Sequence, residues 1–131
     1  MAKLEDNRDV EVSIETKGTF KFKEETTTPS GTGWVDVTIT VPSGKKYIPK
    51  WLYASKSSGA TMTIDNINTA IVPSDSVGVT IDQTAAATKT LQLEPPIMEL
   101  VSGDSVKVSF NLSAYTDGDV RVRLLYQEVD T

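Results

Sequence analysis

Two of the side chains that usually carry catalysis are missing from this chain. The sequence contains no histidine and no cysteine. Their absence removes the usual general base, the Ser-His-Asp triad, thiolate nucleophiles, disulfides and the common zinc ligands. A serine nucleophile would need a lysine as its base, and no serine-lysine pair stands out in the sequence. We therefore expect no bound cofactor and no resident metal.

Paired carboxylates remain the one catalytic option, because two of them can hydrolyse glycosides without histidine. The candidates lie beside expected turns or on outward strand positions, where a solvated surface is the default: Glu94, Glu99, Asp104 and Glu128. The short chain and the absence of any cleft signal argue against hydrolysis. The sequence therefore predicts that the chain is not an enzyme and has no small-molecule substrate.

Two groups of oxygen-bearing side chains could bind calcium. Asp65, Asn66 and Asn68 form one group, and Asp117 and Asp119 form the other. Neither group has the spacing of an EF-hand loop or its terminal glutamate. Asp-Gly is also the commonest hairpin turn, so a structural role in turns is favoured over metal binding.

Three aromatic residues that lie close together in the chain could stack on sugar rings. Alternation predicts that Tyr47, Trp51 and Tyr53 share one face of a strand, which is the arrangement such stacking needs. Residues 47–54, however, carry apolar side chains on both faces of the expected strand. This pattern favours burial of the three rings in the core or in a subunit interface over sugar stacking.

Arg121 and Arg123 occupy alternate positions of the last expected strand, so their guanidinium groups point to the same side. Such a pair can simply be solvated. It can also bind carboxylates of a neighbouring subunit, and Glu11 or Glu15 could supply them. Both arginines are therefore candidate partner-binding residues.

Length and charge limit the classes of partner. The chain has 131 residues, enough for one hydrophobic core, and 13 basic against 18 acidic residues give a net charge of -5. Without a basic block, nucleic acid and anionic membranes are not expected partners. No apolar run resembles a secretory signal or a membrane span, so we expect cytoplasmic synthesis without export.

Alternation of apolar and polar residues predicts the secondary structure. It is clearest in residues 106–112 and 120–126, where valine, leucine and aromatic residues fall on every second position. Asp117-Gly118 between these runs fits a tight hairpin turn. We therefore expect residues 93–129 to form an antiparallel meander.

The rest of the chain is expected to contain further short strands separated by loops. Strands are predicted at residues 10–15, 20–23, 34–41, 47–54, 61–65, 69–72, 77–81 and 91–93. Loops are predicted at residues 24–33, 65–68 and 82–89, and Pro49 predicts a bulge. About eight to ten strands without an amphipathic helix indicate an all-β, antiparallel, jelly-roll-like sandwich. It would be a single domain over residues 10–131, preceded by an arm at residues 1–9.

Several motifs resemble small jelly-roll proteins of tailed bacteriophage virions. These are capsid decoration (cement) proteins and the jelly-roll domains of fibres and spikes, and the similarity spans roughly residues 34–129. The motifs are Ile39-Thr40-Val41-Pro42-Ser43-Gly44-Lys45-Lys46-Tyr47, Lys50-Trp51-Leu52-Tyr53-Ala54-Ser55, Ser58-Gly59-Ala60-Thr61-Met62-Thr63-Ile64, Pro96-Ile97, Ser102-Gly103-Asp104-Ser105-Val106 and Val122-Arg123-Leu124-Leu125-Tyr126-Gln127-Glu128-Val129.

The resemblance implies a virion structural protein that forms a homotrimer on the capsid surface. Its partner would be the major capsid protein, and it would hold neighbouring capsomers together. Such proteins often reach the shell through an amino-terminal arm or strand. The candidate contact residues are Lys3, Leu4, Arg8, Val10 and Val12, together with Arg121 and Arg123. The alternative is a glycan- or receptor-binding module of a tail fibre or spike, with Tyr47, Trp51 and Tyr53 as stacking residues.

Overall fold

A computed structural model describes residues 18–93 and 99–131, which form nine β-strands and no helix. The strands are β1 (Thr19–Thr27), β2 (Gly33–Thr40), β3 (Lys45–Lys56), β4 (Thr61–Val72), β5 (Val79–Thr84), β6 (Lys89–Gln92), β7 (Leu100–Val101), β8 (Ser105–Asp117) and β9 (Val120–Asp130). None of these residues belongs to a helix of the length and apolarity needed to cross a bilayer. The strand number agrees with the eight to ten that the sequence predicts.

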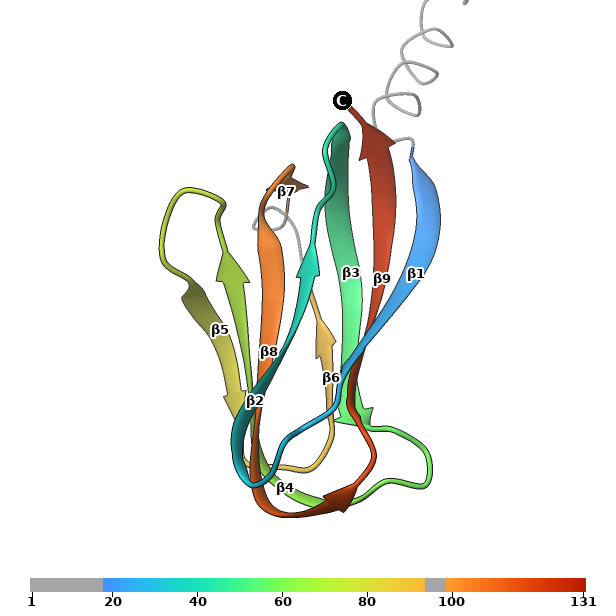
Figure 1. The fold of residues 1–131 in the computed structure, drawn as a ribbon. Helices are drawn as coiled ribbons and strands as arrows, with labels where there is room; N and C mark the ends of the chain where they lie inside the picture. The colour runs from blue at the N-terminus through green and yellow to red at the C-terminus, as the bar shows by residue number, and fades with distance from the viewer. Residues whose placement is uncertain (1–17, 94–98) are drawn as a thin grey trace, which may run out of the picture.

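The strands form two antiparallel sheets that pack face to face (Figure 1). Sheet A has the order β1-β9-β3-β6, with β7 also paired to β3, and sheet B has the order β2-β8-β4-β5. The first strand therefore pairs with the last, the second with the next to last, and the chain crosses repeatedly between the sheets. This is the strand order of a jelly roll. The predicted fold class, an all-β, jelly-roll-like sandwich, is confirmed.

The predicted carboxy-terminal meander was wrong. β8 lies between β2 and β4 in sheet B, whereas β9 lies between β1 and β3 in sheet A. The Asp117-Gly118 turn therefore carries the chain from one sheet to the other, with Gly118 at a φ of 99°. Alternation shows that a strand has one buried face, but it does not show which strands lie beside it.

The core lies between the two sheets and is built by the predicted alternation. On β2, β8 and β9 the apolar set points inward, as expected. Every second residue of a strand faces inward, and the inward residues of the two sheets pack against each other to form one continuous core. The largest fully buried side chains are Phe110, Ile39, Leu52, Ile67, Leu112, Leu124, Val37, Val41, Val106, Val108, Val120 and Val122.

Some strands are longer than predicted. β1 continues to Thr27, inside the expected loop at residues 24–33, because it pairs with β9 along its whole length. β4 is one strand across the expected loop at residues 65–68, and its register against β8 shifts between Ile64 and Asn66. β5 likewise continues to Thr84. Polar residues join a strand when a long, well-packed partner such as β8 or β9 offers them backbone hydrogen bonds.

One polar side chain is buried in this core without a partner. Thr69 on β4 is fully buried, and its hydroxyl has no hydrogen-bond partner within the described residues. An unsatisfied buried hydroxyl costs about 1–3 kcal/mol. Valine has the same shape without the hydroxyl, so Thr69→Val is expected to raise the free energy of unfolding by about 1 kcal/mol. Urea unfolding measures this change.

Thr69→Ser provides the matched control for that measurement. It keeps the hydroxyl and removes the methyl group, so it should lower the free energy of unfolding by about 1 kcal/mol. If Thr69→Val were less stable than the parent protein, the hydroxyl would have a favourable partner, and its assignment as unsatisfied would be wrong.

Candidate functional site on the outer face of sheet A

A bulge in β3 decides where the three predicted aromatic residues lie. The register of β3 against β9 shifts between Pro49 and Trp51, and Lys50 has no partner on β9. The sequence correctly predicts an irregularity at Pro49. The extra residue reverses which side chains face the core, so Trp51 and Tyr53 point outward whereas Tyr47 points inward.

Tyr47 therefore belongs to the core and cannot stack on a ligand. Its side chain is buried, and its ring stacks on that of Tyr126 with 4.0 Å between centroids and 25° between planes. Burial raises the pKa of the Tyr47 hydroxyl, so that it stays neutral. The prediction that Tyr47, Trp51 and Tyr53 share a face was wrong. Burial in the core is confirmed for Tyr47, whereas Trp51 and Tyr53 are exposed in the single chain, and their burial in a subunit interface stays a prediction.

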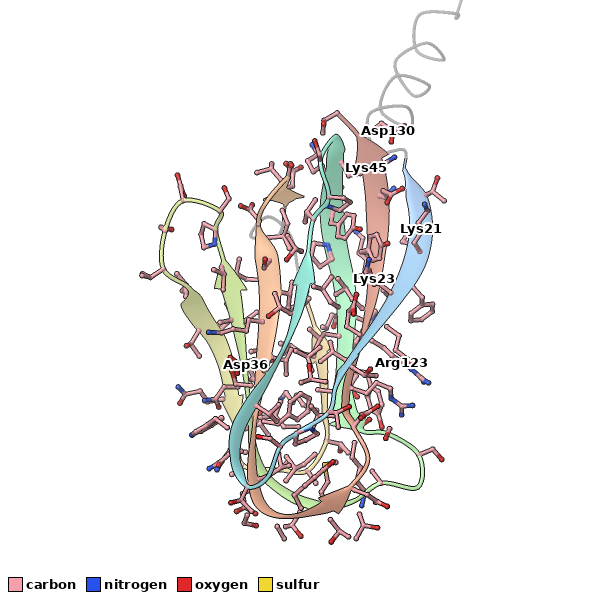
Figure 2. All side chains as sticks on the ribbon, in the orientation of Figure 1. Lys21, Lys23, Asp36, Lys45, Arg123 and Asp130 are labelled. Carbon is pink, nitrogen blue, oxygen red and sulfur yellow. The ribbon has the colours of Figure 1, made fainter. Side chains whose placement is uncertain are left out.

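Two neighbouring rows of outward side chains cross sheet A from β1 through β9 to β3. The cross-strand register gives Phe22, Leu125 and Trp51 in one row, and Glu24, Arg123 and Tyr53 in the next. Figure 2 shows Arg123 on the side of sheet A that faces away from sheet B. Phe20 and Phe22 are 61% and 73% exposed. The face is therefore rich in exposed aromatic side chains, with an arginine in its second row.

A groove of about 330 Å³ separates the aromatic side chains of β1 and β3. It is lined by Phe22, Trp51, Leu52, Tyr53, Thr90, Arg123 and Leu125. A second hollow of about 250 Å³ is lined by Phe22, Lys23, Glu24 and Arg123. Phe22 and Arg123 line both, so the two hollows adjoin. Together they could accept apolar side chains and one acidic group of a partner.

The two predicted arginines differ in their surroundings. Arg123 Nε donates to Glu24 Oε1 at 2.7 Å, and both side chains are about half exposed. Such an exposed ion pair contributes little stability, so Arg123 can exchange Glu24 for another carboxylate. Arg121 Nη2 lies 3.4 Å from Ser55 Oγ, and Arg121 Nε is buried without a partner among the described residues. The acidic partners expected from the sequence, Glu11 and Glu15, lie outside those residues.

The amino-terminal contact residues cannot be placed. Lys3, Leu4, Arg8, Val10 and Val12 all lie outside the described residues, as does the boundary between the predicted arm and the domain. Of the predicted partner-binding set, the structure therefore places Arg121 and Arg123. It brings Arg123 together with Trp51 and Tyr53, which the sequence presents as candidates for burial in the core or a subunit interface, or for glycan stacking.

Sequence reasoning missed Phe20 and Phe22 as surface residues. A strand that alternates phenylalanine with lysine would ordinarily turn the phenylalanines to the core. In β1 the lysines take the inner side instead, where Lys21 Nζ lies 2.8 Å from Glu128 Oε1. This hydrogen bond lowers the pKa of the Glu128 carboxyl and raises that of Lys21. The edge position of β1 makes this possible, because its inner side reaches solvent.

Glu128 belongs to a group of charges at the end of sheet A. Lys45 Nζ lies 3.7 Å from Glu128 Oε1 and 2.6 Å from Asp130 Oδ1. Figure 2 places Lys21, Lys45 and Asp130 at the end of the sandwich where the chain terminates. These groups join β1, β9 and β3, and their mutual pairing gives them a structural role.

Three of the five residues considered for calcium binding, Asp65, Asp117 and Asp119, serve as hydrogen-bond acceptors in turns and strands. Asp117 Oδ1 accepts from the Thr61 amide at 3.1 Å, and Asp119 Oδ1 accepts from Thr28 Oγ1 at 2.6 Å. Asp65 Oδ1 accepts from a serine hydroxyl of β8 at 3.1 Å. In the portion of the chain that the structure describes, no cluster of three or more acidic, histidine or cysteine side chains could hold a metal ion.

The carboxylates considered for hydrolysis are also engaged or outside the structure. Asp104 accepts from the amides of Val101 and Ser74 at 2.9 and 3.0 Å. Glu99 pairs with Lys46 at 3.4 Å, and Glu128 pairs with Lys21. Glu94 lies outside the described residues. The interactions of these three placed carboxylates are those of turns and strand pairs.

Comparison with known proteins adds structural similarity only. No protein-family model and no curated protein matches the sequence. The Drosophila NLP core, a pentamer that binds histones, has a TM-score of 0.42 and 20% identity, over 84% of this chain and 99% of that one. PliG of Aeromonas hydrophila, a periplasmic inhibitor of g-type lysozyme, has a TM-score of 0.37 and 12% identity, over 86% and 88%.

A third solved structure is an enzyme. The exo-β-1,3-galactanase of Phanerochaete chrysosporium, solved with galactose, has a TM-score of 0.32 and 14% identity, over 85% of this chain and 29% of that one. All three TM-scores lie below 0.5, so these likenesses carry no inference about this chain. Function must therefore be argued from the surface of this chain.

Proposed function

We propose that this chain is a non-catalytic virion structural protein, a capsid decoration protein that binds between capsomers of a tailed bacteriophage. The observation that carries the proposal is the exposed aromatic face of sheet A, formed by Phe20, Phe22, Trp51 and Tyr53 with Arg123 beside them. We name this surface the sheet A face. It would be the surface that contacts the major capsid protein.

The chemistry of the sheet A face supports a protein partner. Exposed apolar patches mark interaction sites, and aromatic and arginine side chains are enriched at the centre of protein interfaces. Phe22 and Trp51 flank a groove, so a partner could insert apolar side chains between them. Arg123 could meanwhile exchange Glu24 for an acidic group of the partner, because their pair is half exposed.

The sequence resemblance supports the capsid as the site of assembly. Apart from Pro96-Ile97, which lies outside the described residues, the motifs that resemble decoration proteins lie in β2, β3, β4, β8 and β9 and in the turns next to them, that is, in both sheets. From the same resemblance we propose a homotrimer, located on the capsid surface and synthesised in the host cytoplasm. The arm at residues 1–9 would add a second contact with the shell. The carboxylates that hold turns and strands fit a role without catalysis.

A glycan- or receptor-binding module of a tail fibre or spike is the second candidate. The exposure of Trp51 and Tyr53 favours it, because both rings are free to stack. Sugar selection also requires several hydrogen-bonding groups beside the rings. Of the described residues that line the groove of the sheet A face, Thr90 and Arg123 supply the polar side chains next to these rings. We therefore rank this function second at this surface.

Capsid binding tests the proposal directly. Phe22→Ala and Trp51→Ala remove exposed side chains, so both variants should fold like the parent protein. Each is expected to weaken binding to capsids assembled without this chain by about thirtyfold, the loss typical of an interface hot spot. Co-sedimentation measures the affinity, and mass measurement in solution tests the trimer.

Trp34→Ala is the matched control, because Trp34 is a similarly exposed tryptophan on sheet B. Its capsid affinity should equal that of the parent protein. Full affinity in Phe22→Ala and Trp51→Ala would contradict the role of the sheet A face. Equal losses in all three variants would mean that binding is not localised there.

A further inference from the structure

The outer face of sheet B carries a hollow of its own. Its chemistry differs from that of the sheet A face. Its volume is about 430 Å³, and Trp34 of β2 forms its aromatic wall, with the side chain 55% exposed. The remaining lining residues are small or carry side-chain amides: Asn66, Asn68, Gln83, Thr84 and Ala85. We name this site the Trp34 hollow.

Strand pairing brings these residues together from distant parts of the chain. Trp34 lies opposite Asn111 of β8, and Asn66 of β4 lies opposite the same residue on the other side. In the next row, Asn68 lies opposite Gln83 of β5. The hollow thus extends across the sheet from β2 to β5, with an aromatic ring at one end and amides along it.

The amides of the Trp34 hollow are available to a ligand. Among the described residues, the side-chain amides of Asn66, Asn68 and Gln83 have no hydrogen-bond partner. Each amide offers two donors and one acceptor, so it can bind two neighbouring hydroxyl groups at once. Thr84 differs, because its hydroxyl donates to Asp82 at 2.7 Å.

Charge excludes several ligand classes from the Trp34 hollow. None of its lining side chains is ionisable, and Asp36, on the same strand as Trp34 (Figure 2), does not line it. A phosphate or carboxylate group would therefore lose hydration without gaining an opposite charge, and the nearby Asp36 would repel it. Nucleic acid is disfavoured for the same reason, since phosphate contacts supply most of its affinity.

We propose that the Trp34 hollow binds a neutral saccharide. The apolar face of a pyranose ring would stack on the Trp34 indole, and its hydroxyl groups would pair with the amides of Asn66, Asn68 and Gln83. Aromatic contact area with a few placed polar groups is the usual composition of a small-ligand site, and the volume lies within the usual range of about 300–1,000 Å³.

This inference does not depend on the proposed capsid function. The outer faces of the two sheets point away from each other, since the sheets pack through their inner faces (Figure 1). A saccharide could therefore bind sheet B while the sheet A face contacts a protein. Trp34→Ala tests saccharide binding on sheet B and Trp51→Ala tests capsid binding on sheet A, because each variant removes one exposed tryptophan from one face.

Nuclear magnetic resonance titration of the full chain tests the saccharide site. The probes are lactose, maltotriose, cellotriose, mannotriose and chitotriose. At least one should shift the indole resonance of Trp34 and the side-chain amide resonances of Asn66 and Asn68. Trp34→Ala should weaken that binding by at least about tenfold, the loss of one stacked ring, whereas Trp51→Ala should leave it unchanged.

Asn68→Asp keeps the test decisive if Trp34→Ala does not fold. It preserves the shape of the side chain and removes both amide donors, so binding should fall by about tenfold. The proposal is overturned if no probe in the panel shifts these resonances. It is also overturned if 3′-sialyllactose binds more tightly than lactose, or if Trp51→Ala abolishes binding while Trp34→Ala and Asn68→Asp retain it.

Discussion

Gly118→Ala is expected to lower the free energy of unfolding by about 4 kcal/mol, through strain and overpacking combined. Gly118 lies in the turn between β8 and β9 with a φ of 99°, a conformation that alanine rarely adopts. A Cβ atom there would lie 2.2 Å from the Ala60 Cβ and 2.6 Å from the Ala60 Cα. The second contact is with backbone, so a change of side-chain rotamer cannot relieve it.

The turn that holds Gly118 is tied to the loop after β3. The Ser57 amide donates to the Asp119 carbonyl at 2.7 Å, and the Tyr115 hydroxyl donates to the Gly118 carbonyl at 3.0 Å. These bonds hold Gly118 against Ala60, so displacement of the turn would break them. Because this turn transfers the chain between the sheets, its displacement would also disturb the start of β9.

Gly44→Ala separates backbone strain from crowding. Gly44 has a φ of 80°, and a Cβ atom there meets nothing within 4 Å, so the cost should be only about 1–2 kcal/mol. Ala60→Gly combined with Gly118→Ala should recover part of the loss, because it removes the 2.2 Å contact. Urea unfolding gives all these values. Equal costs at Gly118 and Gly44 would show that the Ala60 contact is absent.

Phe110→Ala is expected to lower the free energy of unfolding by about 3–5 kcal/mol, the usual cost of removing a buried aromatic ring. Phe110 is fully buried at the centre of sheet B, opposite Val35 of β2 and Ile67 of β4. Because β8 lies between β2 and β4, residues on both of these strands lose contacts when the ring is removed. Small domains have only about 5–15 kcal/mol of stability, so this loss would leave the fold marginal.

Two further substitutions check that the Phe110 effect reflects core packing. Phe110→Leu retains most of the apolar volume and should cost less than about 1.5 kcal/mol. Val79→Ala removes methyl groups from a side chain that is 60% exposed on β5, so its effect should stay within about 0.5 kcal/mol. A cost for Phe110→Ala as small as that of Val79→Ala would place Phe110 outside the core.

The two outer faces differ in what they can bind because they differ in what surrounds their tryptophans. Trp51 lies among phenylalanine, leucine, tyrosine and arginine side chains, which suits a protein interface. Trp34 lies among amides without charge, which suits neutral hydroxyl groups. One sandwich can therefore present an assembly surface on sheet A and a ligand surface on sheet B.

The candidate site was only partly predictable from the sequence. Arg123, Trp51 and Tyr53 are all recognisable as candidates, but nothing local shows that they meet on one face. Tyr47 was grouped with the wrong residues because the bulge after Pro49 reverses the alternation by one position. Phe22 was missed because alternation leaves open which face of an edge strand turns outward. Both errors concern which face of a strand a side chain occupies, and this is determined by how the strand pairs and packs in the tertiary structure.

The sequence by itself determined the fold class, the alternating core positions of β2, β8 and β9, and the absence of histidine and cysteine chemistry. These properties follow from local sterics, because a strand alternates its side chains whatever its partner. Only the tertiary structure decided that β8 and β9 belong to different sheets, that Trp51 meets Phe22, and that Trp34 lies across from Asn66. Which strands pair depends on the total of the contacts between segments that are far apart in the chain, and a local sequence pattern does not contain this information.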